Sequence, residues 1–393
     1  MRLAVVTPLD AQSTGVADYS RDLLPHLARA ARGEIQVYSE GETACLNRTE
    51  GWACWPISDL AQAAHELDLI IYQMGNSPAH DFMAPFLFRY PGLVVLHDLS
   101  LHDFFARQAK AGHLAAYVRA FGFGYSVEGT ALARRYLQAP LPVDYPQYLV
   151  SEWLAARSLG VIVHSQHAAS MLTERCPSAR IWVVPMPMPL PAPVTQEEAR
   201  RQLGITGDAY VFVAFGMLNP SKHPIEILET LRRLRAEGIP ARAVFIGREN
   251  STFRLAPEVD RRGLATDVTH LGFADPDTAQ LWMFAADVAV GLRQLYFGET
   301  SASALRLLAT GTPMIVSDVG AFAELPDSAC VKLSFNASDV GQALYAALAQ
   351  LYRDPVRRRA MGRAARDYVA REHDLDRVAT HYVQVVEAIV EGQ

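Results

Sequence analysis

The chain has few of the features that mark membrane-spanning, secreted or metal-stabilised proteins. No uncharged apolar stretch approaches the ~20 residues that a membrane helix needs, and the first apolar run ends before Asp10, too early for a signal peptide. The four cysteines (Cys45, Cys54, Cys176, Cys330) lack a second close pair or a nearby histidine to complete a zinc site. We therefore expect a cytoplasmic protein without an integral membrane segment, whose cysteines are unpaired in a reducing compartment.

A basic excess is also missing. The chain carries 36 Lys and Arg against 42 Asp and Glu, a formal net charge of −6. General nucleic-acid binders and proteins held on anionic lipid normally show the opposite balance. Nucleic acid is therefore not expected as a partner, and the composition leaves room only for weak peripheral contact with a membrane. It does not indicate an oligomeric state.

The length and one proline tract divide the chain. A total of 393 residues exceeds what one hydrophobic core usually serves, and proline occupies every second position from Pro185 to Pro193. Such a tract favours a stiff, extended connector. We expect an N-terminal domain over residues 1–185, a linker over 186–196, a C-terminal domain over 197–371 and a C-terminal helix over 372–393.

Short apolar runs alternate with helical patterns on both sides of this linker. Continuous rather than alternating apolar runs are typical of strands buried on both faces of a parallel sheet. The predicted strands are 3–7, 35–39, 69–72, 93–97, 161–165, 181–185, 210–216, 243–247, 268–272, 288–292 and 313–317, and the predicted helices include 19–32, 224–237, 301–309, 340–352 and 356–371. Residues 104–159 show no strand pattern and are predicted to be a helical insertion. The pattern predicts an α/β fold of two Rossmann-like, doubly wound parallel-sheet domains.

In such folds ligands bind where strands end and helices begin, and the cleft between two such domains is the default site. In the first domain, Gly15 at the mouth of a helix would let backbone amides approach an anion, although an ordinary turn capped by Ser13 or Thr14 explains it equally well. The polar loop from Gly75 to His80 suits sugar hydroxyls. His97 follows a strand directly, and the alternative is a His97–Asp98 pair that satisfies backbone groups.

The second domain offers an anion site. Gly216 ends a strand and Lys222 opens a helix, an arrangement suited to phosphate, although a solvated lysine is the plainer explanation. Thr300 and Ser301 can cap the next helix and leave its amides free, and Glu299 beside them could hold sugar hydroxyls or only complement the helix dipole.

Other patterns are given less weight. Asp275-Pro-Asp277 is interpreted as the cap of a helix over 278–286 rather than as a metal motif, and Gly122-Phe-Gly124 lacks the third glycine of a dinucleotide fingerprint. Because no nucleophile elbow, Walker loop or His-Glu-x-x-His is present, covalent catalysis is not indicated, and we expect neither a cofactor nor a metal.

Together these motifs resemble those of GT-B-fold retaining glycosyltransferases of the family 4, or group 1, type. The resemblance runs nearly end to end. It rests on the Gly15 loop, His97-Asp98, residues 161–165, the loop from Gly216 to Lys222, Gly272-Phe273, the region from Glu299 to Pro313 and a closing helix with Tyr382. The phrase Gly298-Glu-Thr-Ser resembles a bacterial subgroup.

The chain departs from that pattern at three positions. Met217 replaces an arginine that grips the diphosphate in the family, and the family's two glutamates align with Gly298 and Arg306. Glu299 is therefore displaced by one residue. Arg293 and Arg306 are candidates to take over part of the diphosphate binding.

The resemblance implies transfer of a sugar from a UDP- or GDP-linked donor to a hydroxyl acceptor with retention, in surface glycan or polysaccharide synthesis. It implies His97, Lys222 and Glu299 as catalytic residues. The implied donor-side residues are Gly15, Val16, Gly216, Lys222, Phe273, Arg293, Gly298, Glu299, Thr300, Ser301 and Arg306, and the acceptor-side residues are Gly75, Asn76, His80, Asp98 and His102. The alternatives are an epimerase or phosphorylase-like GT-B enzyme, or a non-catalytic sugar-nucleotide-binding homologue.

Overall fold

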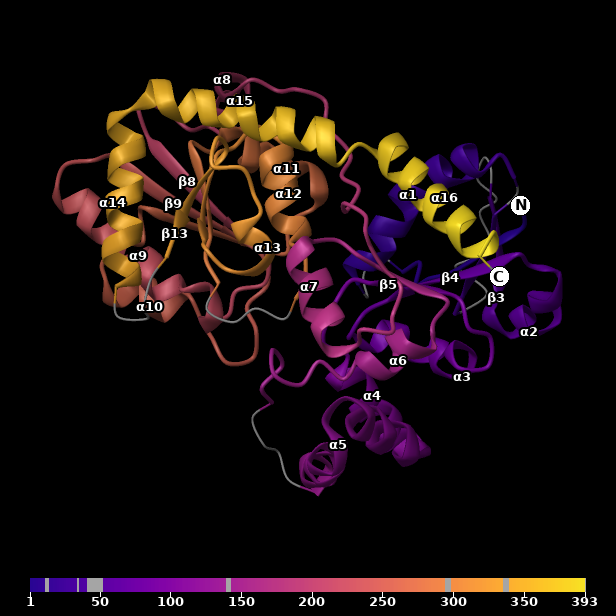
Figure 1. Cartoon of the computed structure of the whole chain (residues 1–393). Helices are drawn as coiled ribbons and strands as arrows, with labels where there is room; N and C mark the ends of the chain where they lie inside the picture. The colour runs from indigo at the N-terminus through magenta and orange to yellow at the C-terminus, as the bar shows by residue number, and fades with distance from the viewer. Residues whose placement is uncertain are drawn as a thin grey trace. The chain divides into compact units, whose positions relative to one another are not determined.

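The computed structural model describes residues 1–10, 14–33, 35–40, 52–138, 143–293, 298–334 and 339–392. The chain forms two compact units (Figure 1). Unit 1 comprises Met1–Pro187, Phe297–Thr300 and His373–Gln393, and unit 2 comprises Met188–Tyr296 and Ser301–Glu372. Each unit is described by itself.

Unit 1 is built on a seven-stranded sheet in the order β3-β2-β1-β4-β5-β6-β7, in which every pair is parallel. Its strands are β1 (Leu3–Val6), β2 (Ile35–Ser39), β3 (Trp52–Pro56), β4 (Leu69–Met74), β5 (Leu93–Leu96), β6 (Gly160–Val163) and β7 (Ile181–Val183). The central strands consist of aliphatic and β-branched residues buried on both faces, as a parallel sheet between helices requires. The order reverses between β1 and β4, which marks the switch point where ligands bind in such sheets.

Helices connect these strands. They are α1 (Gly15–Ala31), α2 (Leu60–Ala63), α3 (Ala84–Leu87), α4 (His102–Gln108), α5 (Leu114–Gln138), α6 (Glu152–Arg157), α7 (Gln166–Arg175) and α16 (Leu375–Val390), with 3₁₀ turns at Ile57–Asp59, Ala64–Glu66 and Pro78–Met83 and a π turn at Ala109–His113. Helix α5 is interrupted at Tyr125 and Ser126, whose backbone is not helical. Between β5 and β6 the described residues form helices and loops.

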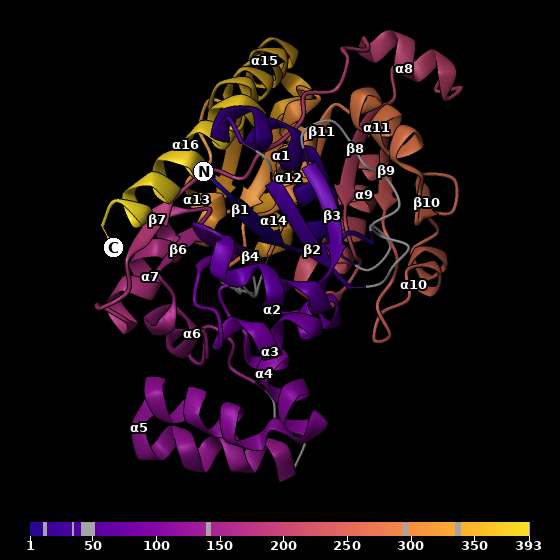
Figure 2. The same ribbon diagram turned by 90° about the vertical axis from the view of Figure 1, so that its right-hand side faces the viewer.

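The C-terminal helix α16 packs against α1 (Figure 2). The hydroxyls of Tyr19 on α1 and Tyr382 on α16 are hydrogen-bonded to each other in the interior. At the surface, Asp376 pairs with His26 at 2.6 Å and with Arg29 at 3.0 Å. The last helix of the chain thus returns to the first domain, as predicted.

Unit 2 has a six-stranded, all-parallel sheet in the order β10-β9-β8-β11-β12-β13. Its elements are α8 (Gln196–Gln202), β8 (Tyr210–Phe215), a 3₁₀ turn (Pro220–Lys222), α9 (Pro224–Ala236), β9 (Ala241–Ile246), α10 (Ala256–Arg261), β10 (Val268–Gly272), α11 (Pro276–Ala285), β11 (Val288–Gly291), α12 (Ala302–Ala309), β12 (Met314–Ser317), α13 (Gly320–Ala323), β13 (Cys330–Leu333), α14 (Val340–Arg353) and α15 (Pro355–Glu372). Helix α14 packs on α9, and α15 packs on α12. Here the order reverses between β8 and β11.

The predicted fold class of two doubly wound parallel sheets is confirmed, and every predicted strand is present with its ends shifted by a few residues at most. Two edge strands, β3 and β13, were not predicted. Strand β3 is partly exposed and ends in a proline, and β13 carries Lys332, so neither shows the continuous apolar run of a central strand. The proline tract from 185 to 193 forms neither helix nor strand.

One expectation about the cysteines is wrong. Cys54 is disulfide-bonded, whereas Cys176 and Cys330 are free and buried. Cys45 lies outside the described residues. Within the described ranges, the model contains no helix of the length and apolar character that crossing a membrane demands.

Candidate functional site

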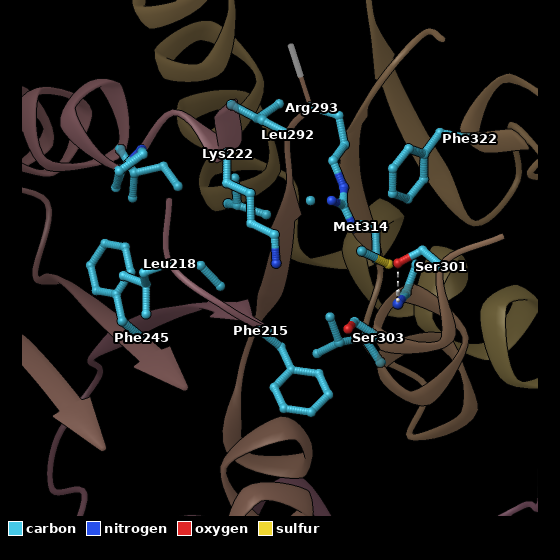
Figure 3. A pocket seen from close by; sticks show the side chains of 18 residues that line it. Phe215, Leu218, Lys222, Phe245, Leu292, Arg293, Ser301, Ser303, Met314 and Phe322 are labelled. Carbon is cyan, nitrogen blue, oxygen red and sulfur yellow. Dashed lines mark hydrogen bonds between the residues drawn. The ribbon is translucent and has the colours of Figure 1, made fainter. Parts of the chain in front are cut away.

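A pocket in unit 2 lies at the carboxyl ends of β8 and β11, at the switch point of the sheet (Figure 3). Residues from the loop after β8, the loop after β11 and the first turns of α12 line it, with Phe245 and Phe322 at its apolar walls. The pocket therefore gathers Gly216, Lys222, Arg293 and Ser301, four of the predicted donor-side residues.

Lys222 is aimed at the backbone of Gly216. If residue 216 carried a Cβ atom, that atom would lie 2.6 Å from the Lys222 ammonium nitrogen and 3.1 Å from the Ser303 hydroxyl. Gly216 also has φ +103°, a conformation that favours glycine. The backbone angle thus favours glycine here, and the Lys222 ammonium lies close to the backbone of this residue.

Arg293 enters the same pocket from the end of β11. Its backbone amide donates to the Ser317 hydroxyl at 2.7 Å, and its guanidinium lies 5.9 Å from the ring centre of Phe322. Figure 3 shows the Lys222 ammonium and the Arg293 guanidinium directed into one space. Two positive charges that converge in this way favour an anionic ligand.

The N-terminus of α12 supplies the third side of the pocket. Ser301 caps the helix by accepting from the Ala304 amide at 3.3 Å, which confirms the predicted capping role. Ser303, the second residue of α12, was not predicted, although its place at the start of a helix that follows a strand is a signal that could have identified it. The partial positive charge of a helix N-terminus adds to that of the two cations. The Thr300 hydroxyl is buried, with no hydrogen-bond partner within the described part of the chain.

Two other predicted donor-side residues do not line this pocket. Phe273 is 71% exposed at the turn after β10, and the Arg248 guanidinium lies 4.5 Å from its ring centre. Arg306 lies on α12, partly buried, outside the lining. Met217, which departs from the family pattern, is 58% exposed.

In unit 1 the predicted acceptor-side loop closes on Asp98. Its carboxylate accepts from the Asn76 amide at 2.7 Å, and the Asn76 side chain donates to Asp103 at 3.1 Å. Burial raises the pKa of Asp98 to about 6, against the lowering effect of the Asn76 amide, and the charges of Glu299 and Asp103 raise it further. Asp98 thus satisfies backbone groups, which was the alternative explanation, and is also a carboxylate that protonates easily.

Gly75 lies close to this carboxylate and to the His80 ring. A Cβ on Gly75 would lie 2.8 Å from His80 Cε1 and 3.1 Å from Asp98 Oδ2, so a side chain at position 75 would displace the ring and crowd the carboxylate. His80 is buried, its Nδ1 contacts Ser77, and its Nε2 has no partner among the described residues. Burial lowers the pKa of His80 to about 4, so its ring is neutral at pH 7.

The short segment of unit 1 that includes Gly298 and Glu299 lies beside the same loop. Gly298 has φ +84°, and a Cβ there would come within 2.3 Å of the Leu99 side chain. Glu299 is close enough to Asp98 for its charge to act on it. Residues 294–297 lie outside the described ranges.

His97 follows β5 and is 8% exposed. Its Nε2 lies 2.8 Å from Gln73 Oε1, the side-chain amide oxygen, and its ring packs edge-on against Tyr19 at 4.5 Å and tilted against His164 at 5.2 Å. Sequence reasoning missed Gln73, although a polar residue inside an otherwise apolar strand is a usable signal.

The surroundings of His102 and of the Gly15 turn differ. The His102 ring is enclosed by aromatic rings and 3% exposed, and burial lowers its pKa to about 4. Thr14 caps α1 by accepting from Val16, which is buried, and a Cβ on the exposed Gly15 would meet nothing. Ser13 lies outside the described residues. The predicted cap of α11 by Asp275 is confirmed, because its carboxylate accepts from Thr278 at 2.9 Å.

The comparison with protein families decides the identity of unit 2. Residues 195–368 match the family described as "Glycosyl transferases group 1". The chain carries a group 1 glycosyltransferase domain. All residues that line the pocket fall inside this glycosyltransferase segment, so the two cations belong to the part of the chain that the family match covers.

Solved structures similar to this glycosyltransferase show that the fold is GT-B. Sucrose-phosphate synthase from Thermosynechococcus elongatus is 16% identical with a TM-score of 0.71, and the match covers 100% of both chains. HepE from Anabaena, in complex with UDP, is 15% identical with a TM-score of 0.68 over 98% of this chain and 99% of that one. A glycosyltransferase from Rickettsia africae is 12% identical with a TM-score of 0.67 over 100% and 99%. None of the curated protein sequences compared with this chain matches it.

Proposed function

We propose that this glycosyltransferase moves a sugar from a UDP- or GDP-linked donor to a hydroxyl acceptor with retention at the anomeric carbon. The observation that carries the proposal is the convergence of Lys222, Arg293 and the α12 N-terminus in one pocket at the switch point of the unit 2 sheet. A nucleoside diphosphate is the anion that such a set of donors fits best.

The leaving diphosphate gains negative charge as its bond to the sugar breaks. Fixed positive groups aimed at that charge stabilise the transition state more than the bound donor, and this difference lowers the barrier. Lys222 and Arg293 supply two full charges, and the amides of α12 supply a partial one. In this proposal the side chains neutralise the diphosphate, and no metal is required.

Retention without a covalent intermediate on the protein requires the acceptor oxygen to attack the face that the diphosphate leaves. The bond from the anomeric carbon to the diphosphate oxygen breaks, the bond to the acceptor oxygen forms, and the acceptor proton passes to the departing phosphate. His97 and Glu299 bind and orient the sugar hydroxyls. Gly75, Asn76, His80 and Asp98 form the acceptor side.

The donor and setting are also proposals. HepE, which shares the fold, has been solved with UDP and with UDP-glucose, and this supports a uridine donor. A cytoplasmic location and a role in surface glycan or polysaccharide synthesis are proposed from the family resemblance.

The test is nucleotide release from a panel of UDP-, GDP- and ADP-sugars, each with and without EDTA. Lys222→Ala is compared with Lys332→Ala. Lys332 lies on β13, pairs with Asp327 and does not line the pocket. We expect one donor to turn over in EDTA, to lose at least 100-fold in rate in Lys222→Ala and to keep its rate in Lys332→Ala. Loss of all turnover in EDTA would contradict the metal-free proposal.

The same panel separates the alternatives. Conversion of the donor sugar without an acceptor would indicate an epimerase. Donor binding without turnover across a broad set of acceptors would indicate a binding protein that has lost catalysis. Equal rates in both lysine variants would overturn the assignment of the pocket.

A further inference from the structure

A buried polar cluster in unit 1 surrounds His97 and extends to the C-terminal helix. Its members are Gln73 from β4, Tyr19 from α1, His164 after β6 and Tyr382 from α16. All are at most 8% exposed. Burying this many polar groups is costly unless they bond to one another, so their arrangement needs an explanation.

Gln73 fixes which nitrogen of His97 carries the proton. The side-chain amide oxygen of Gln73 (Oε1) accepts only, and it lies 2.8 Å from His97 Nε2. The proton of a neutral ring must therefore reside on Nε2, which leaves Nδ1 as the acceptor of the ring. Burial, and the neighbouring His164 and His80, lower the pKa of His97 well below its usual value, so the ring is neutral at pH 7.

The Tyr19–Tyr382 pair fixes the orientation of the ring. The edge-on contact with Tyr19, 4.5 Å between ring centres at 80°, blocks rotation of His97 on one side. The Tyr19 hydroxyl is bonded to that of Tyr382, so α16 anchors the blocking ring. Burial raises the pKa of Tyr382, and side-chain hydrogen bonds with Tyr19 and Gln73 oppose that rise, which links Tyr382 to Gln73 as well.

His164 closes the other side. Its ring centre lies 5.2 Å from that of His97, and its own Nδ1 bonds to the Val184 carbonyl at 2.8 Å. This bond holds the His164 ring in place. His97 is thus enclosed by three side chains, each fixed by a further partner.

We infer that Gln73 and the Tyr19–Tyr382 pair are positioning residues that hold His97 as its Nε2-protonated tautomer and present Nδ1 as a hydrogen-bond acceptor to a substrate hydroxyl. The inference rests on the proposed function in taking His97 as the residue that meets the substrate. It excludes proton donation by neutral His97 from Nδ1. It also gives α16, the last helix of the chain, a role in positioning His97.

The test combines kinetics with ¹⁵N NMR of the full chain labelled at its histidines, with His97 assigned from a His97→Gln spectrum. Gln73→Met removes the acceptor and keeps the shape, and Tyr382→Phe removes one hydroxyl. Gln36→Met and Tyr210→Phe are the controls, because Gln36 accepts from Tyr38 and Tyr210 donates to the Leu348 carbonyl, both away from His97.

In the unmodified chain and both controls we expect the signals of an Nε2-protonated, neutral His97. Gln73→Met and Tyr382→Phe should shift those signals toward a tautomer mixture and lower kcat about 10- to 100-fold, with KM for the donor unchanged. Unchanged His97 signals in both test variants would overturn the inference. A changed tautomer in a chain that transfers no sugar would support the positioning role and overturn the proposed function instead.

Discussion

The two units differ in the charge of their polar side chains. In unit 1 the polar groups are buried histidines, namely His80, His97, His102, His164 and His373, whereas in the described part of unit 2 the one buried histidine is His223. In unit 2 the pocket instead presents Lys222 and Arg293. Neutral imidazole rings can form hydrogen bonds with hydroxyl groups, and cations attract a diphosphate. The proposed acceptor and donor sides therefore differ in the charge of their polar groups.

We expect the cationic pocket of unit 2 to depend most strongly on Gly216. Gly216→Ala would place a methyl group 2.6 Å from the Lys222 ammonium in a backbone conformation with φ +103°. We expect the transfer rate to fall about 10- to 100-fold and the free energy of unfolding to fall by about 1–2 kcal/mol. Enzyme assays and urea denaturation measure the two effects.

Gly15→Ala is the matched control, because a Cβ there meets no atom within 4 Å and φ is not positive. It should change stability by less than about 0.5 kcal/mol. Equal losses in both variants would show that the effect is not specific to the cationic pocket.

The buried neutral histidines should make unit 1 less stable in acid. His80, His102 and His164 have pKa values lowered to about 4 by burial, so between pH 6.5 and 4 the unfolded chain binds protons that the folded chain does not. The contribution of these histidines to the free energy of unfolding is complete above pH 6.5 and is lost as the pH falls toward 4. His102→Gln should reduce the fall in the free energy of unfolding between pH 7 and pH 5 by about 1–2 kcal/mol.

Urea denaturation followed by tryptophan fluorescence in a Trp282→Phe background reports on unit 1, which holds Trp52, Trp55, Trp153 and Trp182. His65→Gln serves as the control because His65 is on the surface. If both variants lost stability with falling pH as steeply as the unmodified chain, burial of His102 would not be the cause.

Asp98 should show the reverse dependence. Its pKa of about 6 is above the unfolded value, so the folded chain prefers the protonated form and the ionised form destabilises it above pH 6. Asp98→Asn keeps an acceptor for the Asn76 amide and should stabilise the chain by about 1–2 kcal/mol at pH 8, with most of the gain lost near pH 4.

Thermal unfolding at both pH values tests this expectation against Asp208→Asn, since Asp208 is exposed. A gain in Asp98→Asn that persists at pH 4 would point to improved packing instead of removal of a buried charge.

The sequence predicted the strands and the cationic pocket because both depend on local pattern. Runs such as Leu69–Met74 are apolar on both faces, and Gly216 and Lys222 lie within one loop. The cluster around His97 could not be predicted because Tyr19 and Tyr382 are 363 residues apart and meet only through the packing of α16 on α1. The aromatic enclosure of His102 could not be predicted either, because the rings around it come from separate parts of the chain.

The central claim is that unit 2 binds the diphosphate through its cations. Calorimetric titration of UDP and GDP in EDTA, into the unmodified chain and into Lys222→Ala, Arg293→Ala, Arg232→Ala and His97→Ala, tests it most directly. Arg232 is an exposed arginine of α9 and serves as the charge control. We expect the first two variants to bind the nucleotide about 10- to 100-fold more weakly and the last two to bind it as the unmodified chain does. Unchanged affinity in Lys222→Ala and Arg293→Ala, or an equal loss in His97→Ala, would contradict the account.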